Sequence, residues 1–252
     1  MKITIYGGAE EIGGNKILIE SDKTRIFFDF GVEFNRGEEY FMDYLQPRDK
    51  LGLKDYFELK LIPEIKGVFA KKHLKETGLK YISPRIDAIF ISHIHGDHID
   101  DLRWVDEDIP VYLGNGAKKL LNVFNTIYRT KKIEHPRMYT FKSFERIRIK
   151  NIEIIPVHVD HSIPASYGFI IKTGEGNIAY TGDFRIHGFK PEMTMDFIKT
   201  AQKEKIKVLI SEGTRIKKEE DDIFREKIRE TEVEERIFET IKKSKDITVI
   251  EL

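Results

Sequence analysis

Residues 88–98 read AIFISHIHGDH, an apolar run that leads directly into three imidazoles and one carboxylate. Residues two positions apart in an extended chain point to the same side, so His93 and His95 can face one metal ion. The glycine that follows lets the backbone turn, and Asp97 and His98 can then face a second metal ion. A polar loop of solvated histidines is the alternative, but ligand-type residues at this density are typical of a metal site.

The residue types narrow the choice of metal. The chain contains no cysteine, which excludes disulfides and thiolate-ligated metal sites. Imidazole and carboxylate ligands together suit zinc better than manganese or iron. Isolated histidines such as His73 and His135 are expected to be structural.

Length and composition indicate a globular protein of the cytoplasm. The chain has 252 residues, of which 40% are hydrophobic and 34% charged, enough for one large domain or two smaller ones. No apolar run approaches the roughly 18 residues of a membrane-spanning helix, and residues 1–6 resemble a strand rather than a signal peptide. We therefore expect no membrane partner. Abundant Lys, Glu and Ile with only two Gln resemble the composition of thermophile proteins.

The overall charge gives no sign of nucleic-acid binding, because the formal net charge is zero. Its distribution is less even, since residues 129–150 contain eight Lys or Arg but only two Glu. This stretch is either an ordinary solvated face or a surface that contacts a phosphate backbone. The sequence leaves both readings open.

The hydrophobic pattern predicts two groups of strands with helices between and outside them. Strands are expected over residues 2–6, 16–20, 25–29, 87–91, 110–113, 147–150, 153–157, 167–172, 177–180, 208–211 and 247–250. Helices are expected from Asn115, from Pro191 to about Lys203 and after a capping box at Thr231 and Glu234, with short pieces between residues 38 and 85. The predicted fold class is α/β, a four-layer αββα sandwich that is incomplete at the C-terminus.

Further ligand-type residues follow the predicted strands. His158 and His161 come after the strand that is expected to end at residue 157, and Asp183 follows the strand that ends at residue 180. Asp29 and Glu212 close two other strands. Polar residues at the carboxyl ends of strands are where α/β sheets usually place their chemistry.

These motifs resemble the metallo-β-lactamase superfamily. Within it they are similar to the β-CASP nucleases, the group that contains RNase J and the endonuclease subunit of the cleavage and polyadenylation factor. Residues 93–98 carry the superfamily motif, whereas residues 10–15 (EEIGGN), 161–164 (HSIP) and 181–185 (TGDFR) look particularly like RNase J and its archaeal relatives. The resemblance runs from about residue 3 to residue 214.

The resemblance implies a site for two zinc ions. His93, His95 and His161 would bind one zinc, whereas Asp97 and His98 would bind the other. RNA phosphodiester bonds would be hydrolysed there with the help of both metals.

Three further acids receive roles from the same resemblance. Asp183 would bridge the two zinc ions, and Asp29 would orient a ligand histidine by accepting its other N–H. Glu212 would support a catalytic histidine, which makes Glu212, with Asp97 and Asp183, a candidate catalytic residue. The alternative interpretation is structural: Asp29 and Asp183 would then be turn residues, and Glu212 would cap a helix or take part in an ion pair. His158 competes for the zinc role of residue 161, which is favoured because Ser-Ile-Pro follows it.

The chain departs from the family pattern at its C-terminal end. Complete β-CASP nucleases carry another zinc-binding histidine beyond an inserted β-CASP domain, whereas here the last histidine is His187. We therefore expect residues 1–213 to be the N-terminal portion of a metallo-β-lactamase domain and residues 214–252 to begin the inserted domain. The second zinc site would be incomplete, and catalysis by this chain alone would be weak or absent.

Two alternatives to an RNA-cleaving enzyme remain. The same metal loop serves small-molecule hydrolases of the superfamily, which act on thioesters or lactones. A non-catalytic RNA-binding relative is the other alternative, because some β-CASP proteins have lost ligands. The sequence also leaves a homodimer open.

Overall fold

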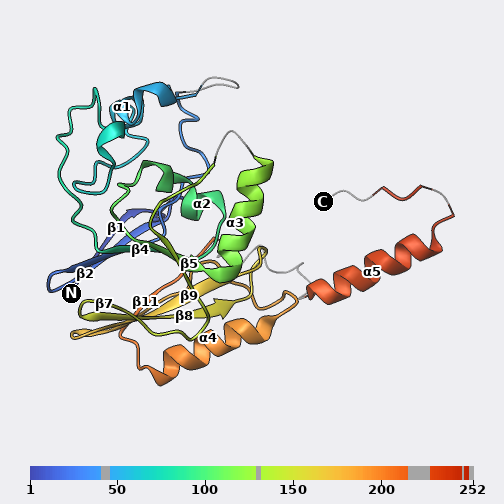
Figure 1. The fold of residues 1–252 in the computed structure, drawn as a ribbon. Helices are drawn as coiled ribbons and strands as arrows, with labels where there is room; N and C mark the ends of the chain where they lie inside the picture. Colours follow the sequence, from blue (N-terminus) through green and yellow to red (C-terminus); the bar gives the residue numbers. More distant parts are fainter. Residues whose placement is uncertain (41–45, 129–131, 215–227, 246, 250–252) are drawn as a thin grey trace.

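Two β-sheets lie face to face in the computed structural model of the chain, which describes residues 1–40, 46–128, 132–214, 228–245 and 247–249 (Figure 1). The first sheet has the strand order β1-β2-β3-β4-β5-β6 and the second β11-β10-β9-β8-β7. The first sheet contains β1 (Lys2–Gly7), β2 (Lys16–Ser21), β3 (Thr24–Phe28), β4 (Ala88–Ile91), β5 (Val111–Gly114) and β6 (Met138–Phe141). The second contains β7 (Ile147–Ile149), β8 (Ile152–Val159), β9 (Ser166–Thr173), β10 (Gly176–Tyr180) and β11 (Val208–Ile210).

Helices cover the outer faces of both sheets. In Figure 1, α1, α2 and α3 lie beside the first sheet, α4 lies beneath the second, and α5 projects from the body. The α-helices are α1 (Lys54–Glu58), α2 (Gly96–Ile99), α3 (Asn115–Ile127), α4 (Pro191–Lys203) and α5 (Glu230–Lys243). Short 3-10 helices are η1 (Asp49–Leu51), η2 (Lys71–His73) and η3 (Asp100–Trp104). In the part of the chain that the structure describes, no helix is long and apolar enough to cross a bilayer.

Three apolar cores separate the four layers. Phe27 and Phe28 are neighbours on β3, so their side chains point to opposite faces of the first sheet. Phe27 packs under the outer helices with Leu121 of α3, whereas Phe28 meets Phe169 of the second sheet at a ring-centroid distance of 5.3 Å. Phe197 of α4 covers the outer face of the second sheet. The predicted αββα sandwich is confirmed.

Parallel pairing brings the polar strand ends to one end of the sandwich. β3 pairs parallel with β4, so Asp29 and His93 follow these strands at the same edge of the first sheet. β8 and β10 are both antiparallel to β9 and hence parallel to each other, and β10 is parallel to β11. His161, Asp183 and Glu212 therefore follow the second sheet's strands at one edge.

Three local predictions differ from the structure. Helix α5 begins at Glu230 with Arg229 as its N-cap and no side-chain cap, so the predicted capping box at residues 231 and 234 is wrong. Residues 247–249 form no strand, because they meet no neighbouring strand and their Ile247 and Val249 are 93% and 86% exposed; Ile250 lies outside the described residues. Strand β6 was not expected, since two of its four residues are exposed at the edge of the sheet. The domain boundary at residue 213 stays a prediction.

Candidate metal centre

Three histidines from both sheets converge on one point. His93 and His95 follow β4, and His161 follows β8 of the other sheet. The Nδ1 atom of His95 lies 3.0 Å from Nε2 of His93 and 3.2 Å from Nε2 of His161. These three nitrogen atoms lie within 4.8 Å of one another, which makes them a candidate set of metal ligands. The side chains predicted for the first metal are thus brought together.

A second group, made of His93, His98 and Asp183, shares His93 with the first, and the predicted ligand Asp97 lies outside both groups. Nε2 of His98 lies 3.2 Å from Oδ1 of Asp183 and 3.3 Å from Oδ2 of Asp97. The other carboxylate oxygen of Asp183 lies 3.7 Å from Nε2 of His161 and 4.0 Å from Nε2 of His93. Asp183 therefore lies between the two groups, where a bridging ligand is expected.

Asp29 lies behind the second group and is fully buried. Its Oδ2 atom lies 2.7 Å from Nδ1 of His98, which makes His98 the histidine that Asp29 is placed to orient. The backbone N–H and the hydroxyl of Ser92 donate to Asp29 at 2.7 and 2.8 Å, and the hydroxyl of Tyr180 donates at 2.5 Å. Asp29 has a φ of +58°, a conformation that costs a non-glycine residue about 1–3 kcal/mol and is concentrated at functional sites.

Burial keeps the first group of histidines neutral. It holds the pKa of His93 well below the usual value, with the neighbouring imidazoles adding to the effect. Burial likewise lowers the pKa of His95, and it lowers that of His161 to about 4 although Asp183 acts in the opposite direction. Metals bind neutral imidazole, so these ligands need not lose a proton first.

In the second group the charged forms of His98 and Asp183 are favoured, unlike those of the first three histidines. Burial disfavours the charged form of His98, but Asp29, Asp183 and Asp97 outweigh it and raise the pKa of His98 well above its usual value. Burial alone would raise the pKa of Asp183, yet the hydrogen bond and charge of His98 lower it. The carboxylates around His98 thus favour a positive charge at this position.

Two loops grip the backbone of the metal loop. Asn15 N–H donates to the carbonyl oxygen of Asp97 at 3.1 Å, and Phe30 N–H donates to that of His98 at 2.8 Å. A Cβ atom on Gly31 would lie 1.9 Å from the carbonyl carbon of Asp97. The glycine turn at residues 13–15, which the sequence placed among the family motifs, therefore lies against the ligand residues themselves.

A buried ion triad, which no pattern in the sequence predicted, supports this contact. Nζ of Lys16 lies 2.9 Å from Asp101, and the guanidinium of Arg36 binds the same carboxylate through two hydrogen bonds of 2.7 and 2.5 Å. Lys16 also donates to the carbonyl oxygens of Gly14 and Gly31. Burial lowers the pKa of Lys16 despite the attraction of Asp101. The residues lie far apart in sequence, so only the fold brings them together.

Another ion pair joins the loops that carry His161 and Asp183. Nε of Arg185 lies 3.3 Å from Oδ1 of Asp160, and Arg185 N–H donates to the carbonyl oxygen of Asp160 at 2.7 Å. The same guanidinium binds Glu230 at the start of α5. Arg185 therefore ties the metal loops of the second sheet to α5.

Glu212 lies beside the loop of Asp183 and not in either ligand group. Its Oε1 atom accepts the N–H of Phe184 at 2.9 Å. Burial raises the pKa of Glu212, and the charge of Asp183 adds to this rise. Glu212 thus contacts the backbone next to Asp183, and its side chain also forms a hydrogen bond with Thr214.

His158 does not compete with His161 for the metal. The strand β8 extends to Val159, so His158 lies inside it and its ring stacks on Tyr167 at a centroid distance of 4.2 Å. Among the described residues, His158 belongs to neither ligand group.

The two isolated histidines have structural surroundings, as expected. His73 packs edge-on against Trp104 at 4.9 Å. Nε2 of His135 donates to the carbonyl oxygen of Asp106 at 3.1 Å.

The predicted basic stretch is partly neutralised by carboxylates. Arg146 lies 2.6 Å from Glu153, and Lys150 lies 2.6 Å from Asp87. Residues 129–131 lie outside the described residues. These ion pairs favour a solvated face over a surface that contacts phosphates.

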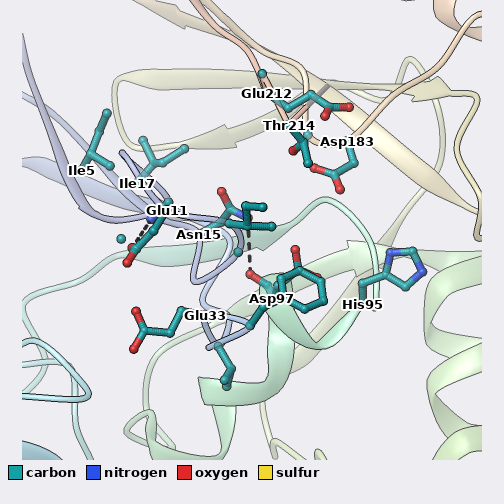
Figure 2. Close-up of a pocket in the computed structure, with 18 of the residues that line it drawn as sticks. Ile5, Glu11, Asn15, Ile17, Glu33, His95, Asp97, Asp183, Glu212 and Thr214 are labelled. Carbon is teal, nitrogen blue, oxygen red and sulfur yellow. Dashed lines mark hydrogen bonds between the residues drawn. The ribbon is translucent and has the colours of Figure 1, made fainter. Parts of the chain in front are cut away.

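A cleft of about 1070 Å³ opens next to the candidate ligands. Asp183, Glu212 and Thr214 lie on one side of it, and His95 and Asp97 lie on the other (Figure 2). Among the described residues that line this cleft there is no lysine or arginine. Its acids are Glu10, Glu11, Glu33, Asp97, Asp100, Asp183 and Glu212.

The ligand atoms fit a bound metal. A single ring nitrogen, Nδ1 of His95, approaches Nε2 of both His93 and His161. One imidazole nitrogen either donates one hydrogen or offers one lone pair, so it cannot satisfy both contacts. A divalent cation that accepts the lone pairs of all three nitrogens removes this conflict, and imidazole with carboxylate is a donor set that suits zinc.

Comparisons with known proteins agree with this geometry. The family model described as "Beta-lactamase superfamily domain" matches residues 66–232. Ribonuclease J of Mycoplasma genitalium is 29% identical over 218 residues, which cover 84% of this chain and 33% of the relative. Ribonuclease J 2 of Staphylococcus aureus is 28% identical over 226 residues, 86% of this chain and 35% of the relative. The chain thus spans about a third of the length of these curated relatives.

A solved structure matches nearly the whole fold. It is the crystal structure of a protein of unknown function from Enterococcus faecalis V583, with a TM-score of 0.76 and 26% sequence identity. The match covers 94% of this chain and 56% of the other. The family model covers the metal loop, and the structure has both sheets of the sandwich. The chain therefore belongs to the metallo-β-lactamase superfamily, within which it is similar to the ribonuclease J proteins.

Proposed function

We propose that the chain provides the metal centre of a nuclease that hydrolyses RNA phosphodiester bonds with two zinc ions. The observation that carries the proposal is the pair of ligand groups that share His93 beside the cleft. His93, His95 and His161 would hold one metal, and His98 and Asp97 would hold the other, with Asp183 as a ligand available to both. The similarity to ribonuclease J proteins supports RNA as the substrate.

Asp97, Asp183 and Glu212 have different roles in the proposed reaction. Bound zinc supplies Lewis acidity, which lowers the pKa of water and offsets phosphate charge. Asp97 and Asp183 would hold the metals together with His98, because both carboxylates lie within 3.3 Å of its Nε2. Glu212 keeps the Asp183 loop in place through the N–H of Phe184.

The charge of the cleft makes metal loading a condition for RNA binding. Its described lining contains carboxylates and no lysine or arginine, so it repels a polyanion when no metal is present. Two divalent cations next to Asp97 and Asp183 reverse the local sign. Chelation should therefore abolish RNA binding in the cleft as well as cleavage.

Zinc binding and RNA cleavage by the purified chain test the proposal together. Zinc content is measured first, and cleavage of a fluorescent single-stranded RNA is then followed with and without chelator. Asp97→Asn should abolish zinc-dependent cleavage, whereas Asp196→Asn on the exposed face of α4 should not change it. Cleavage that survives Asp97→Asn would overturn the assignment of this centre.

The rival functions give different results in the same experiment. Hydrolysis of a thioester without RNA cleavage identifies a small-molecule hydrolase. Zinc-independent RNA binding without cleavage identifies a binding module. We expect the chain to hold one zinc well and the second weakly, or neither tightly, because the described residues offer the second metal only His98 and Asp97 beside the shared Asp183; two tightly bound zinc ions would contradict this expectation.

A further inference from the structure

We infer that Tyr180 and Ser92 are positioning residues that set, through Asp29, which ring nitrogens of His93 and His98 are available to metal. The inference rests on the proposed metal centre and extends it to two residues that coordinate nothing themselves. Tyr180 acts through the buried carboxylate of Asp29, whereas Ser92 contacts both that carboxylate and the ring of His93. Their position is what makes the shared ligand and the second metal's histidine ready for binding.

The buried carboxylate of Asp29 accepts from four donors. Ser92 N–H donates to Oδ1 at 2.7 Å, whereas Oδ2 faces the Ser92 hydroxyl at 2.8 Å, Nδ1 of His98 at 2.7 Å and the Tyr180 hydroxyl at 2.5 Å. Since Asp29 is fully buried, loss of any donor leaves part of its charge without a partner.

Counting hydrogens assigns the tautomers. Nδ1 of His98 carries the hydrogen that binds Asp29, so Nε2, which donates to Asp97 and Asp183 in the metal-free chain, is the ring nitrogen left for a metal once it gives up its own hydrogen. The Ser92 hydroxyl donates to Asp29 and lies 3.3 Å from Nδ1 of His98 and 3.0 Å from Nδ1 of His93, from which it can accept a hydrogen. Nε2 of His93 is consequently left with a free lone pair, and His93 belongs to both ligand groups.

Tyr180 makes this arrangement depend on the second sheet. It ends β10, three positions before Asp183, and its ring lies in the core between the sheets, 6.1 Å from the ring of Phe28. The strand that delivers Asp183 therefore also holds Asp29, which holds His98. This shared support explains why ligands from separate sheets meet within 3.2 Å.

Zinc titration of matched tyrosine variants tests the role of Tyr180. Tyr180→Phe removes only the hydroxyl, and Tyr167→Phe removes the hydroxyl of another buried tyrosine in the same core. Loss of an outer contact of this kind typically weakens metal binding 10–100-fold. We expect Tyr180→Phe to weaken the second zinc by roughly tenfold or more and to leave the first zinc unchanged, whereas Tyr167→Phe changes neither.

The tautomer of His93 is a readout that simple loss of packing would not alter. In ¹⁵N spectra of the chelator-treated chain, His93 should carry its hydrogen on Nδ1. Ser92→Ala should allow the other tautomer and weaken both zinc ions, because His93 belongs to both groups. Ser92→Thr keeps the hydroxyl and should restore the original spectrum and both affinities.

The outcomes separate this inference from the proposed function. If the wild-type chain binds no zinc but His93 shows the Nδ1 tautomer that Ser92→Ala abolishes, the proposed function fails and the hydrogen-bond network stands. If the chain binds zinc but Tyr180→Phe behaves like Tyr167→Phe, or if Ser92→Ala leaves the His93 spectrum unchanged, the inference is overturned. Equal weakening of both zinc ions by Tyr180→Phe, in step with a lower melting temperature, would also overturn it.

Discussion

Gly31→Ala should damage the metal centre more than any other addition of one methyl group nearby. The new Cβ would lie 1.9 Å from the carbonyl carbon and oxygen of Asp97 and 2.2 Å from the nitrogen of His98. Backbone atoms cannot rotate away, and the same carbonyl oxygen of Asp97 already accepts the N–H of Asn15. Overpacking costs about 1–3 kcal/mol, and each backbone hydrogen bond lost beside it about 0.5–1.5 kcal/mol. A loss of about 2 kcal/mol or more is therefore expected.

The magnitude can be measured against a matched glycine. A destabilisation of about 2 kcal/mol lowers the melting temperature by roughly 4–8 °C in a chain of this size. Gly174→Ala is the control, because its Cβ would meet no atom within 4 Å. Thermal unfolding and zinc content are compared for both variants. If Gly31→Ala melts within about 1 °C of the control and binds zinc equally well, the loops do not grip the metal loop as argued.

Two further predictions concern buried charge and pH. Asp101→Asn leaves Lys16 and Arg36 buried without their shared carboxylate and should lower the free energy of unfolding by about 3–5 kcal/mol in urea unfolding. The control is Glu239→Gln, at an exposed ion pair on α5, which should change the free energy of unfolding by less than about 0.5 kcal/mol. After metal removal, stability should fall as the pH falls from about 6.5 towards about 4, since the unfolded chain binds a proton at His161 that the folded chain, with its pKa of about 4, does not. His161→Gln should make that slope shallower, and an unchanged slope would contradict the argument.

Local patterns in the sequence were sufficient for the layers and for most ligands. The four buried residues of β4 predicted a central strand, and the carboxyl ends of strands predicted where His161 and Asp183 lie. The position of Asp29 against His98 followed from the family resemblance. His158 was harder to place, because its strand continues two residues further than the apolar pattern suggests.

The remaining features depend on contacts between distant segments. Lysine usually lies at the protein surface, and only the fold shows that Lys16 is 2% exposed and lies beside Asp101. Tyr180 has the pattern of an ordinary core residue, and its hydroxyl acquires a partner only when the second sheet packs on the first. Helix α5 begins without its predicted cap, and its first residue, Glu230, is bound by Arg185, which is 45 positions earlier in the sequence.

The division of the ligands between the sheets couples metal binding to folding. His93 and His98 belong to the first sheet, whereas His161 and Asp183 belong to the second, so the centre exists only when the core between the sheets is packed. Any ligand that binds the folded but not the unfolded chain stabilises it by mass action. Zinc should therefore act as a clamp between the sheets, and the buried contact of Tyr180 does the same from inside the core. This coupling accounts for the costly burial of charged groups at this one end of the sandwich.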